Sequence, residues 1–307
     1  MRRVFAVLVS LCLFSLSGCA AQKAPLESQP ESRQEPVSSM ETPGMIESAE
    51  PEKTQIEGEC KMEILTFKRD DKKIYGELYL PAGEGPFPAV IMAHGFGGQC
   101  AHNRPYAEVF AQNGIAAYIF DFIGGGNDIQ SDGETTEMSV LTEAADMAVV
   151  LGGLTAMEQI DSQNIFLAGQ SQGGFVASYV AGTQPEKVRG LVAIFPAYVL
   201  QDDAKKRMEG REIPETEEIM GLLLGRIYAE DAMSFDIYDV IKNYPGPALL
   251  IHGTADQLVP IEYSRRAVEV FPSAELVEIE GAGHGFSGAD EERAIRLSLD
   301  FVKKSIQ

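Results

Sequence analysis

Short apolar segments alternate with amphipathic segments along most of the chain. Residues 89–93 and 248–251 are continuous apolar runs that each follow a proline, a pattern typical of parallel strands buried on both faces. The first two predicted strands form a hairpin across residues 69–72. Strands are predicted at Lys61–Lys68, Lys73–Leu80, Phe87–His94, Ile115–Asp121, Ile165–Gly169, Gly190–Phe195, Ala248–His252 and Glu275–Ile279.

Helical periodicity fills most intervals between the later strands. Strands that alternate with helices indicate a parallel sheet with helices on both faces, connected by right-handed crossovers. We therefore predict an α/β fold with a mostly parallel, eight-stranded sheet. Helices are predicted at Arg104–Asn113, Ser139–Met157, Gln172–Thr183, Glu262–Val270 and Asp290–Lys303.

One interval interrupts this alternation. Residues 196–247 are too many for a simple connection between two strands, and they contain helical patches of their own, such as Ile219–Ile227. We predict that a cap of about residues 197–246 is inserted after the sixth strand.

The amino-terminal segment has the character of an export signal. Two arginines precede an apolar run, Val4–Leu16, that is too short to span a bilayer as a stable helix. The run ends in Leu16-Ser17-Gly18-Cys19, which resembles the lipobox of bacterial lipoproteins. This resemblance implies that residues 1–18 are removed, that Cys19 carries the lipid, and that the protein is anchored outside the cytoplasm on the bacterial cell membrane. An ordinary secretory signal cut nearby is the alternative.

Residues 20–58 are rich in Pro, Glu, Ser and Gln, with almost no aromatic or β-branched side chains. Such a segment cannot bury enough apolar surface to offset its ordering entropy. We predict a disordered tether over residues 19–58 and a catalytic domain over residues 59–307. The formal net charge of −21 argues against nucleic-acid binding, which needs clustered Lys and Arg.

Two cysteines, Cys60 and Cys100, fall within the predicted domain. Cys60 begins an edge strand and Cys100 follows the end of a central strand, so they lie at opposite edges of the sheet. A disulfide needs Cα atoms within about 7 Å of each other. Two free thiols are therefore expected.

The strongest chemical signal is Gly169-Gln170-Ser171-Gln172-Gly173, a G-x-S-x-G pattern. A predicted strand precedes it and a predicted helix follows, so Ser171 falls on a tight strand-to-helix turn. The flanking glycines leave room for that turn, and the helix amino terminus favours a developing anion. We predict that Ser171 is a nucleophile.

A serine nucleophile needs a base, and the base needs an orienting acid. His284 lies in a glycine-rich loop after the last strand, on the strand edge where parallel sheets bind ligands. Between Ser171 and His284, Asp256 follows directly after an apolar strand on the same edge. We predict His284 as base and Asp256 as acid. His94 and His252 end strands and suit backbone hydrogen bonds.

Two backbone amides should stabilise the oxyanion of acyl transfer. One is expected from Gln172, directly after the nucleophile. The other is expected from Phe96 in the loop of residues 94–98, whose glycines allow close approach of the backbone.

Together, the motifs at residues 94–98, 169–174, 252–256 and 283–286 resemble those of α/β-hydrolase fold esterases, especially the bacterial cinnamoyl (feruloyl) esterase branch. The resemblance covers roughly residues 60–305 and implies a triad of Ser171, His284 and Asp256 with oxyanion amides on Phe96 and Gln172. One departure is the long, glycine-rich loop of residues 121–128, which is expected near the mouth of the site.

The first hypothesis is a cell-surface carboxylic-ester hydrolase, acting through an acyl-enzyme on feruloyl or short acyl esters, whether small molecules or linked to polysaccharide. No cofactor is needed, and no His/Cys cluster indicates a metal. One alternative is a serine exopeptidase of the dipeptidyl or acylaminoacyl type. Another is a non-catalytic binding protein on a hydrolase scaffold, although such a scaffold has no need of an exposed serine on a strained turn.

Overall fold

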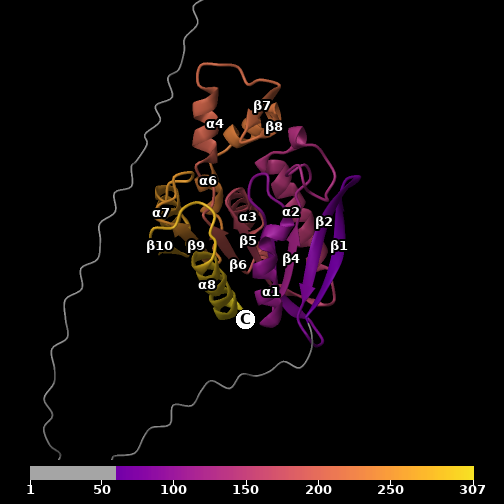
Figure 1. Ribbon diagram of the computed structural model, residues 1–307. Coiled ribbons are helices and arrows are strands. Elements are labelled where there is room, and N and C mark those ends of the chain that lie inside the picture. Colours follow the sequence, from indigo (N-terminus) through magenta and orange to yellow (C-terminus); the bar gives the residue numbers. More distant parts are fainter. Residues whose placement is uncertain (1–59) are drawn as a thin grey trace, which may run out of the picture. The chain divides into compact units, whose positions relative to one another are not determined.

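The computed structural model describes residues 60–307. Its main sheet has eight strands in the order β1-β2-β4-β3-β5-β6-β9-β10 (Figure 1). The strands are β1 (Lys61–Arg69), β2 (Lys72–Leu80), β3 (Phe87–Ala93), β4 (Ala116–Phe120), β5 (Ile160–Gln170), β6 (Gly190–Ile194), β9 (Ala248–Gly253) and β10 (Ala274–Ile279). The β1–β2 hairpin is antiparallel, as is the β2–β4 pairing, and the other neighbours pair in parallel. The predicted fold class is confirmed.

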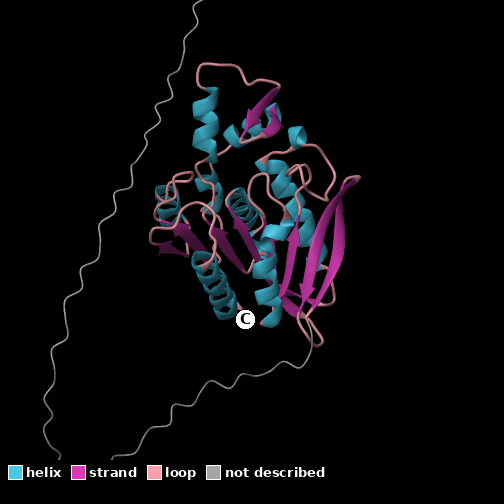
Figure 2. Ribbon diagram, in the orientation of Figure 1, coloured by secondary structure: helices cyan, strands magenta, loops and turns pink. Residues whose placement is uncertain are grey.

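Helices cover both faces of this sheet (Figure 2). The helices that connect or follow its strands are α1 (Arg104–Gln112), α2 (Val140–Thr155), α3 (Gln172–Thr183), α7 (Glu262–Val270) and α8 (Ala289–Ser305). Alternate residues of a strand enter different cores, because successive side chains point to opposite faces. Ile91 belongs to the core that contains residues of α2, α3 and α7, whereas Val90 belongs to the core that contains residues of α1 and α8. Both side chains are fully buried, as expected for a parallel strand covered on both faces.

The insertion between β6 and β9 contains five elements of its own: α4 (Leu200–Met208), β7 (Thr216–Ile219), β8 (Leu222–Gly225), α5 (Arg226–Met233) and α6 (Ile237–Ile241). In Figure 1, α4, β7 and β8 lie together at one end of the sheet. Contacts with the segment before α2 hold the insertion. The Thr135 hydroxyl donates to the Leu223 carbonyl at 2.6 Å, and Ser139 Oγ is hydrogen-bonded to the carboxylate of Asp231.

The prediction of a helical patch at Ile219–Ile227 is wrong. These residues form the turn and second strand of the antiparallel β7–β8 hairpin and then the start of α5. Met220 and Gly221 both have positive φ, 49° and 84°, which suits a two-residue hairpin turn. Burial alternates through the three leucines that follow, since Leu222 and Leu224 are buried and Leu223 is exposed. Such a short run of leucines fits the periodicity of a helix or of a strand, so the Met220-Gly221 turn decides which of the two forms.

The predicted signal peptide, tether and lipid-bearing Cys19 lie outside the described residues, and the lipid anchor stays a prediction from the sequence. Within residues 60–307, no helix combines the length and apolar character needed to cross a membrane. Cys60 is exposed, Cys100 is buried, and both are free thiols, as predicted.

Candidate active site

Ser171 occupies the turn between β5 and α3, with φ 51° and ψ −117°. A non-glycine residue rarely adopts positive φ, so this conformation is strained and must be held by its surroundings. The glycines on either side permit it. A Cβ on Gly169 would lie 2.3 Å from the Gly173 backbone, and one on Gly173 would lie 2.4 Å from the His94 carbonyl oxygen. The glycines of the pattern are therefore required by close backbone packing.

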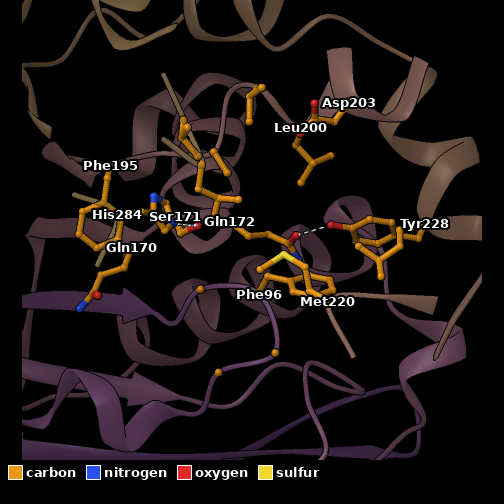
Figure 3. Close-up of a pocket in the computed structure, with 18 of the residues that line it drawn as sticks. Phe96, Gln170, Ser171, Gln172, Phe195, Leu200, Asp203, Met220, Tyr228 and His284 are labelled. Atoms are coloured by element: carbon orange, nitrogen blue, oxygen red, sulfur yellow. Dashed lines mark hydrogen bonds between the residues drawn. The ribbon is translucent and has the colours of Figure 1, made fainter. Parts of the chain in front are cut away.

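The structure brings Ser171, His284 and Asp256 together, and Figure 3 labels the first two. His284 Nε2 lies 3.0 Å from Ser171 Oγ, and His284 Nδ1 lies 2.7 Å from Asp256 Oδ2. The Phe195 ring packs edge-on against the His284 imidazole, with ring centroids 4.9 Å apart. If His284 donates from Nδ1 to Asp256, its Nε2 is free to accept the Ser171 proton. This arrangement suits general-base activation of a serine.

Asp256 is held rigidly in the turn after β9. Its Oδ1 accepts hydrogen bonds from the backbone N–H groups of Leu258 at 2.9 Å and Val259 at 2.8 Å. Sequence reasoning assigned His252 a backbone contact, and its Nε2 does lie 2.9 Å from the Val259 carbonyl. The same nitrogen also lies 3.2 Å from Asp256 Oδ2, a contact that no local motif indicated. Burial lowers the pKa of His252, which favours its neutral form beside the carboxylate.

Both residues whose amides are predicted for the oxyanion border the same cavity as Ser171: Phe96 in the loop after β3 and Gln172 at the start of α3. Neither the Phe96 nor the Gln172 N–H donates to another described residue, so both are available to a ligand. Gly95 approaches closely, because a Cβ there would lie 3.2 Å from Ser171 Cβ. The buried His94 holds this loop, with Nδ1 2.8 Å from the Gly95 carbonyl oxygen and Nε2 3.3 Å from the Phe122 N–H nitrogen. The strand-end role expected for His94 is confirmed.

A cavity of about 370 Å³ opens in front of Ser171 (Figure 3). The sheet edge and the insertion both contribute to its wall. From the sheet side come the loop of residues 95–98, Phe195 and Leu258; from the insertion come Leu200, Asp203, Arg207, Ile219, Met220 and Tyr228. Met220 and Leu258 are large apolar side chains left substantially exposed. The exposed wall of the cavity is thus more apolar than polar, as in most small-molecule sites, although Asp203 and Arg207 place charges on the insertion side.

The glycine-rich loop of residues 121–128, expected near the mouth of the site, supplies no residue to the cavity wall. It packs against the loop of residues 94–98, whose glycines line the cavity. A Cβ on Gly126 would lie 2.9 Å from the Gly98 carbonyl oxygen, and one on Gly125 would lie 3.2 Å from the His94 ring. Asp121 accepts the backbone N–H groups of Cys100 and Gln130. These glycines therefore serve close packing and not ligand contact.

Two residues that the sequence did not single out hold the Gln172 side chain: Tyr228 of the cavity wall and the buried Glu143 of α2. Tyr228 of α5 donates to Gln172 Oε1 at 2.7 Å, and the Gln172 Nε2 donates to Glu143 Oε2 at 2.8 Å. No motif surrounds either residue, so no local signal could have found them. Among the described residues, no group of three or more His, Cys, Asp or Glu side chains could hold a metal ion.

Family models agree with this geometry. Residues 84–234 match a model described as serine aminopeptidase, S33, and residues 236–302 match one described as TAP-like protein. The strand order and the triad geometry point the same way. The chain has the α/β-hydrolase fold.

Individual relatives of this chain are distant. The structure titled "Ferulic Acid bound to Est1E from Butyrivibrio proteoclasticus" has a TM-score of 0.71 and 23% identity, covering 78% of this chain and 98% of that one. Quorum-quenching protein AidA of Acinetobacter baumannii (strain MDR-ZJ06) is 24% identical over 78% of this chain and 94% of its own length. Non-heme chloroperoxidase CPO-A1 of Kitasatospora aureofaciens is 34% identical, but over only 26% of this chain and 30% of its own length.

Proposed function

We propose that this α/β hydrolase cleaves carboxylic esters through an acyl-enzyme, with Ser171 as nucleophile, His284 as general base and Asp256 as orienting acid. The observation that carries the proposal is the continuous hydrogen-bond path from Ser171 Oγ through the His284 imidazole to Asp256, at 3.0 and 2.7 Å. Each member can be held in a productive orientation before substrate arrives, which is the basis of nucleophilic catalysis by serine.

In the proposed reaction Ser171 Oγ attacks the ester carbonyl while its proton passes to His284 Nε2. The carbonyl oxygen becomes an oxyanion that accepts from the Phe96 and Gln172 amides. His284 then returns the proton to the departing alcohol. Water, deprotonated by His284, cleaves the acyl-enzyme and restores Ser171.

The apolar cavity favours an acyl or alcohol group with aliphatic or aromatic surface. The likeness to a structure that holds ferulic acid supports feruloyl or short acyl esters as the first class to test. The charged side chains of the insertion that line the cavity are Asp203 and Arg207. Five further acidic residues of the insertion are absent from the wall: Glu215, Glu217, Glu218, Glu230 and Asp231.

A second candidate is a serine exopeptidase, since the larger matching model is described as serine aminopeptidase, S33. An amide substrate would use the same triad. The two candidates differ in the bond cleaved, so parallel assays separate them.

The test compares wild-type protein with Ser171→Ala on p-nitrophenyl butyrate, methyl ferulate and aminoacyl p-nitroanilides. We expect wild-type turnover of the esters and a loss of at least about a hundredfold in kcat for the variant, because no other group replaces the nucleophile. A fluorophosphonate probe should label the wild type and not the variant. Undiminished ester turnover by Ser171→Ala would remove the proposed nucleophile, and turnover of the anilides alone would favour the exopeptidase.

A further inference from the structure

Tyr228 of the insertion touches the side chains of both residues whose amides face the proposed oxyanion. Its ring packs edge-to-face on the Phe96 ring, with centroids 5.8 Å apart and an interplanar angle of 60°. Its hydroxyl donates to Gln172 Oε1 at 2.7 Å, the dashed line beside Tyr228 in Figure 3. Phe96 lies in the loop after β3 and Gln172 is the first residue of α3, so Tyr228 links the two segments that carry the oxyanion amides.

The far end of the Gln172 side chain is also fixed. Gln172 Nε2 donates to Glu143 Oε2 of α2 at 2.8 Å, and Tyr228, Gln172 and Glu143 are all at most 5% exposed. We call these three residues the buried hydrogen-bond chain. A buried amide that loses a partner leaves a polar atom unsatisfied, which costs about 1–3 kcal/mol, so the Gln172 side chain is strongly restrained. Gln172 is the first residue of α3, so the two hydrogen bonds that hold its side chain also restrain the start of the helix, where its N–H lies.

The insertion has a second contact with the oxyanion loop. Gly97 has φ 64°, and a Cβ there would lie 3.0 Å from Leu222 Cδ1 of β8. The insertion itself is fixed on the segment before α2, since a Cβ on Gly225 would lie 2.1 Å from the Thr136 carbonyl oxygen. The β7–β8 hairpin and α5 are therefore packed against the loop of residues 94–98, the start of α3 and the segment that precedes α2.

We propose that Tyr228 is a positioning residue that sets the spacing of the Phe96 and Gln172 amides, so that the insertion controls the rate of acyl transfer in addition to lining the cavity. The inference rests on the proposed function. Catalysis by an oxyanion hole depends on donors fixed where the charge develops, and a misplacement of about 1 Å can cost about a hundredfold in rate. Tyr228 touches no reacting atom in this scheme and acts through the two residues it holds.

The test is Tyr228→Phe, which removes the hydroxyl and keeps the ring. The matched control is Tyr198→Phe, because Tyr198 is also a buried tyrosine whose hydroxyl bonds to α3, at 2.7 Å from Ser178 Oγ, but it touches neither oxyanion residue. With p-nitrophenyl butyrate we expect kcat of Tyr228→Phe to fall about tenfold, with KM within about twofold, because both donors remain but are less well held. Tyr198→Phe should keep both constants within about twofold of wild type.

A trifluoromethyl ketone probes the oxyanion directly. Ser171 Oγ adds to its carbonyl carbon, His284 takes the proton, and the resulting oxyanion accepts from the two amides. Its inhibition constant should rise for Tyr228→Phe by about the same factor as kcat falls, whereas the inhibition constant of the matching methyl ketone, which stays a neutral carbonyl, should not. A change in KM alone, or an unchanged affinity for the trifluoromethyl ketone, would overturn the positioning role.

Variants at Glu143 test the same chain from its other end. Glu143→Gln keeps an oxygen that accepts from Gln172 Nε2 and should retain nearly wild-type kcat, whereas Glu143→Met removes it and should lower kcat as Tyr228→Phe does. Equal kcat in these two variants would contradict the proposal, even if Tyr228→Phe failed to fold. The wild type checks the proposed function separately: no ester turnover and no inhibition by the trifluoromethyl ketone would contradict that function itself.

Discussion

The strand edge that carries the triad and the insertion that completes the cavity are built on different principles. At the strand edge each functional residue follows a strand of the main sheet, and its position depends on residues a few places away in the chain. Ser171 needs Gly169 and Gly173, and Asp256 needs the amides two and three residues later. The insertion is held by contacts distant in sequence, such as Thr135 with Leu223 and Tyr228 with Gln172. Short motifs can therefore specify the positions of the triad residues, whereas they cannot specify the shape of the cavity.

The largest expected effect is the difference in kcat between a carboxylate variant at the strand edge and one in the insertion. Asp256→Asn should lower kcat for p-nitrophenyl butyrate by about 10³–10⁴, because the amide no longer selects the productive His284 tautomer. Asp203 of the insertion lines the same cavity without contacting the triad, so Asp203→Asn should leave kcat within about threefold and act on KM. Steady-state kinetics of the two variants makes the comparison. A loss in kcat for Asp203→Asn as large as for Asp256→Asn would show that the insertion supplies chemistry as well as shape.

An intermediate effect should come from the backbone packing of the strand edge. Gly173→Ala places a Cβ 2.4 Å from the His94 carbonyl oxygen, so the turn or β3 must shift, and we expect a loss of about 3 kcal/mol in unfolding free energy with reduced kcat. Gly283→Ala, beside His284, is the control, because its Cβ would meet no atom within 4 Å. Urea unfolding followed by circular dichroism measures both. Equal stabilities would mean that the close packing at the turn is not required.

The smallest effect concerns the boundary between the two regions, at Glu143. Burial raises the pKa of Glu143 well above 4.5. The folded protein then keeps a proton that the unfolded chain releases above about pH 4.5, so the unfolding free energy should fall as pH rises from there, by at most about 1.4 kcal/mol per pH unit. Glu143→Gln lacks this proton, and its stability relative to wild type should grow between pH 4.5 and 6.0. Urea midpoints at several pH values measure the difference, and a difference independent of pH would mean that Glu143 is charged in the fold.

The sequence predicted most of the strand edge because the residues that position the triad there lie close to it along the chain. Apolar runs marked the strands, and the G-x-S-x-G pattern with the later Asp256 and His284 marked three positions that the structure brings together. The sequence predicted that an insertion follows the sixth strand, but it did not predict the β7–β8 hairpin within it. Leu222–Leu224 fits a helix or a strand equally well, and only the Met220-Gly221 turn decides between them. Glu143 and Tyr228 could not be found, since their roles arise from burial against Gln172, which spacing does not encode.

The place of the insertion between β6 and β9 limits how such enzymes can diversify. These two strands are parallel neighbours, so the chain must return across the sheet between them whatever else it carries, and α6 lies on that return, with Ile237 and Ile241 buried in the core. The insertion thus has two parts with different roles: residues 200–233 line the cavity, and the return segment completes the crossover from β6 to β9. Exchange of residues 200–233 between relatives would alter the cavity wall, while loss of the return segment would break the crossover that joins β6 to β9.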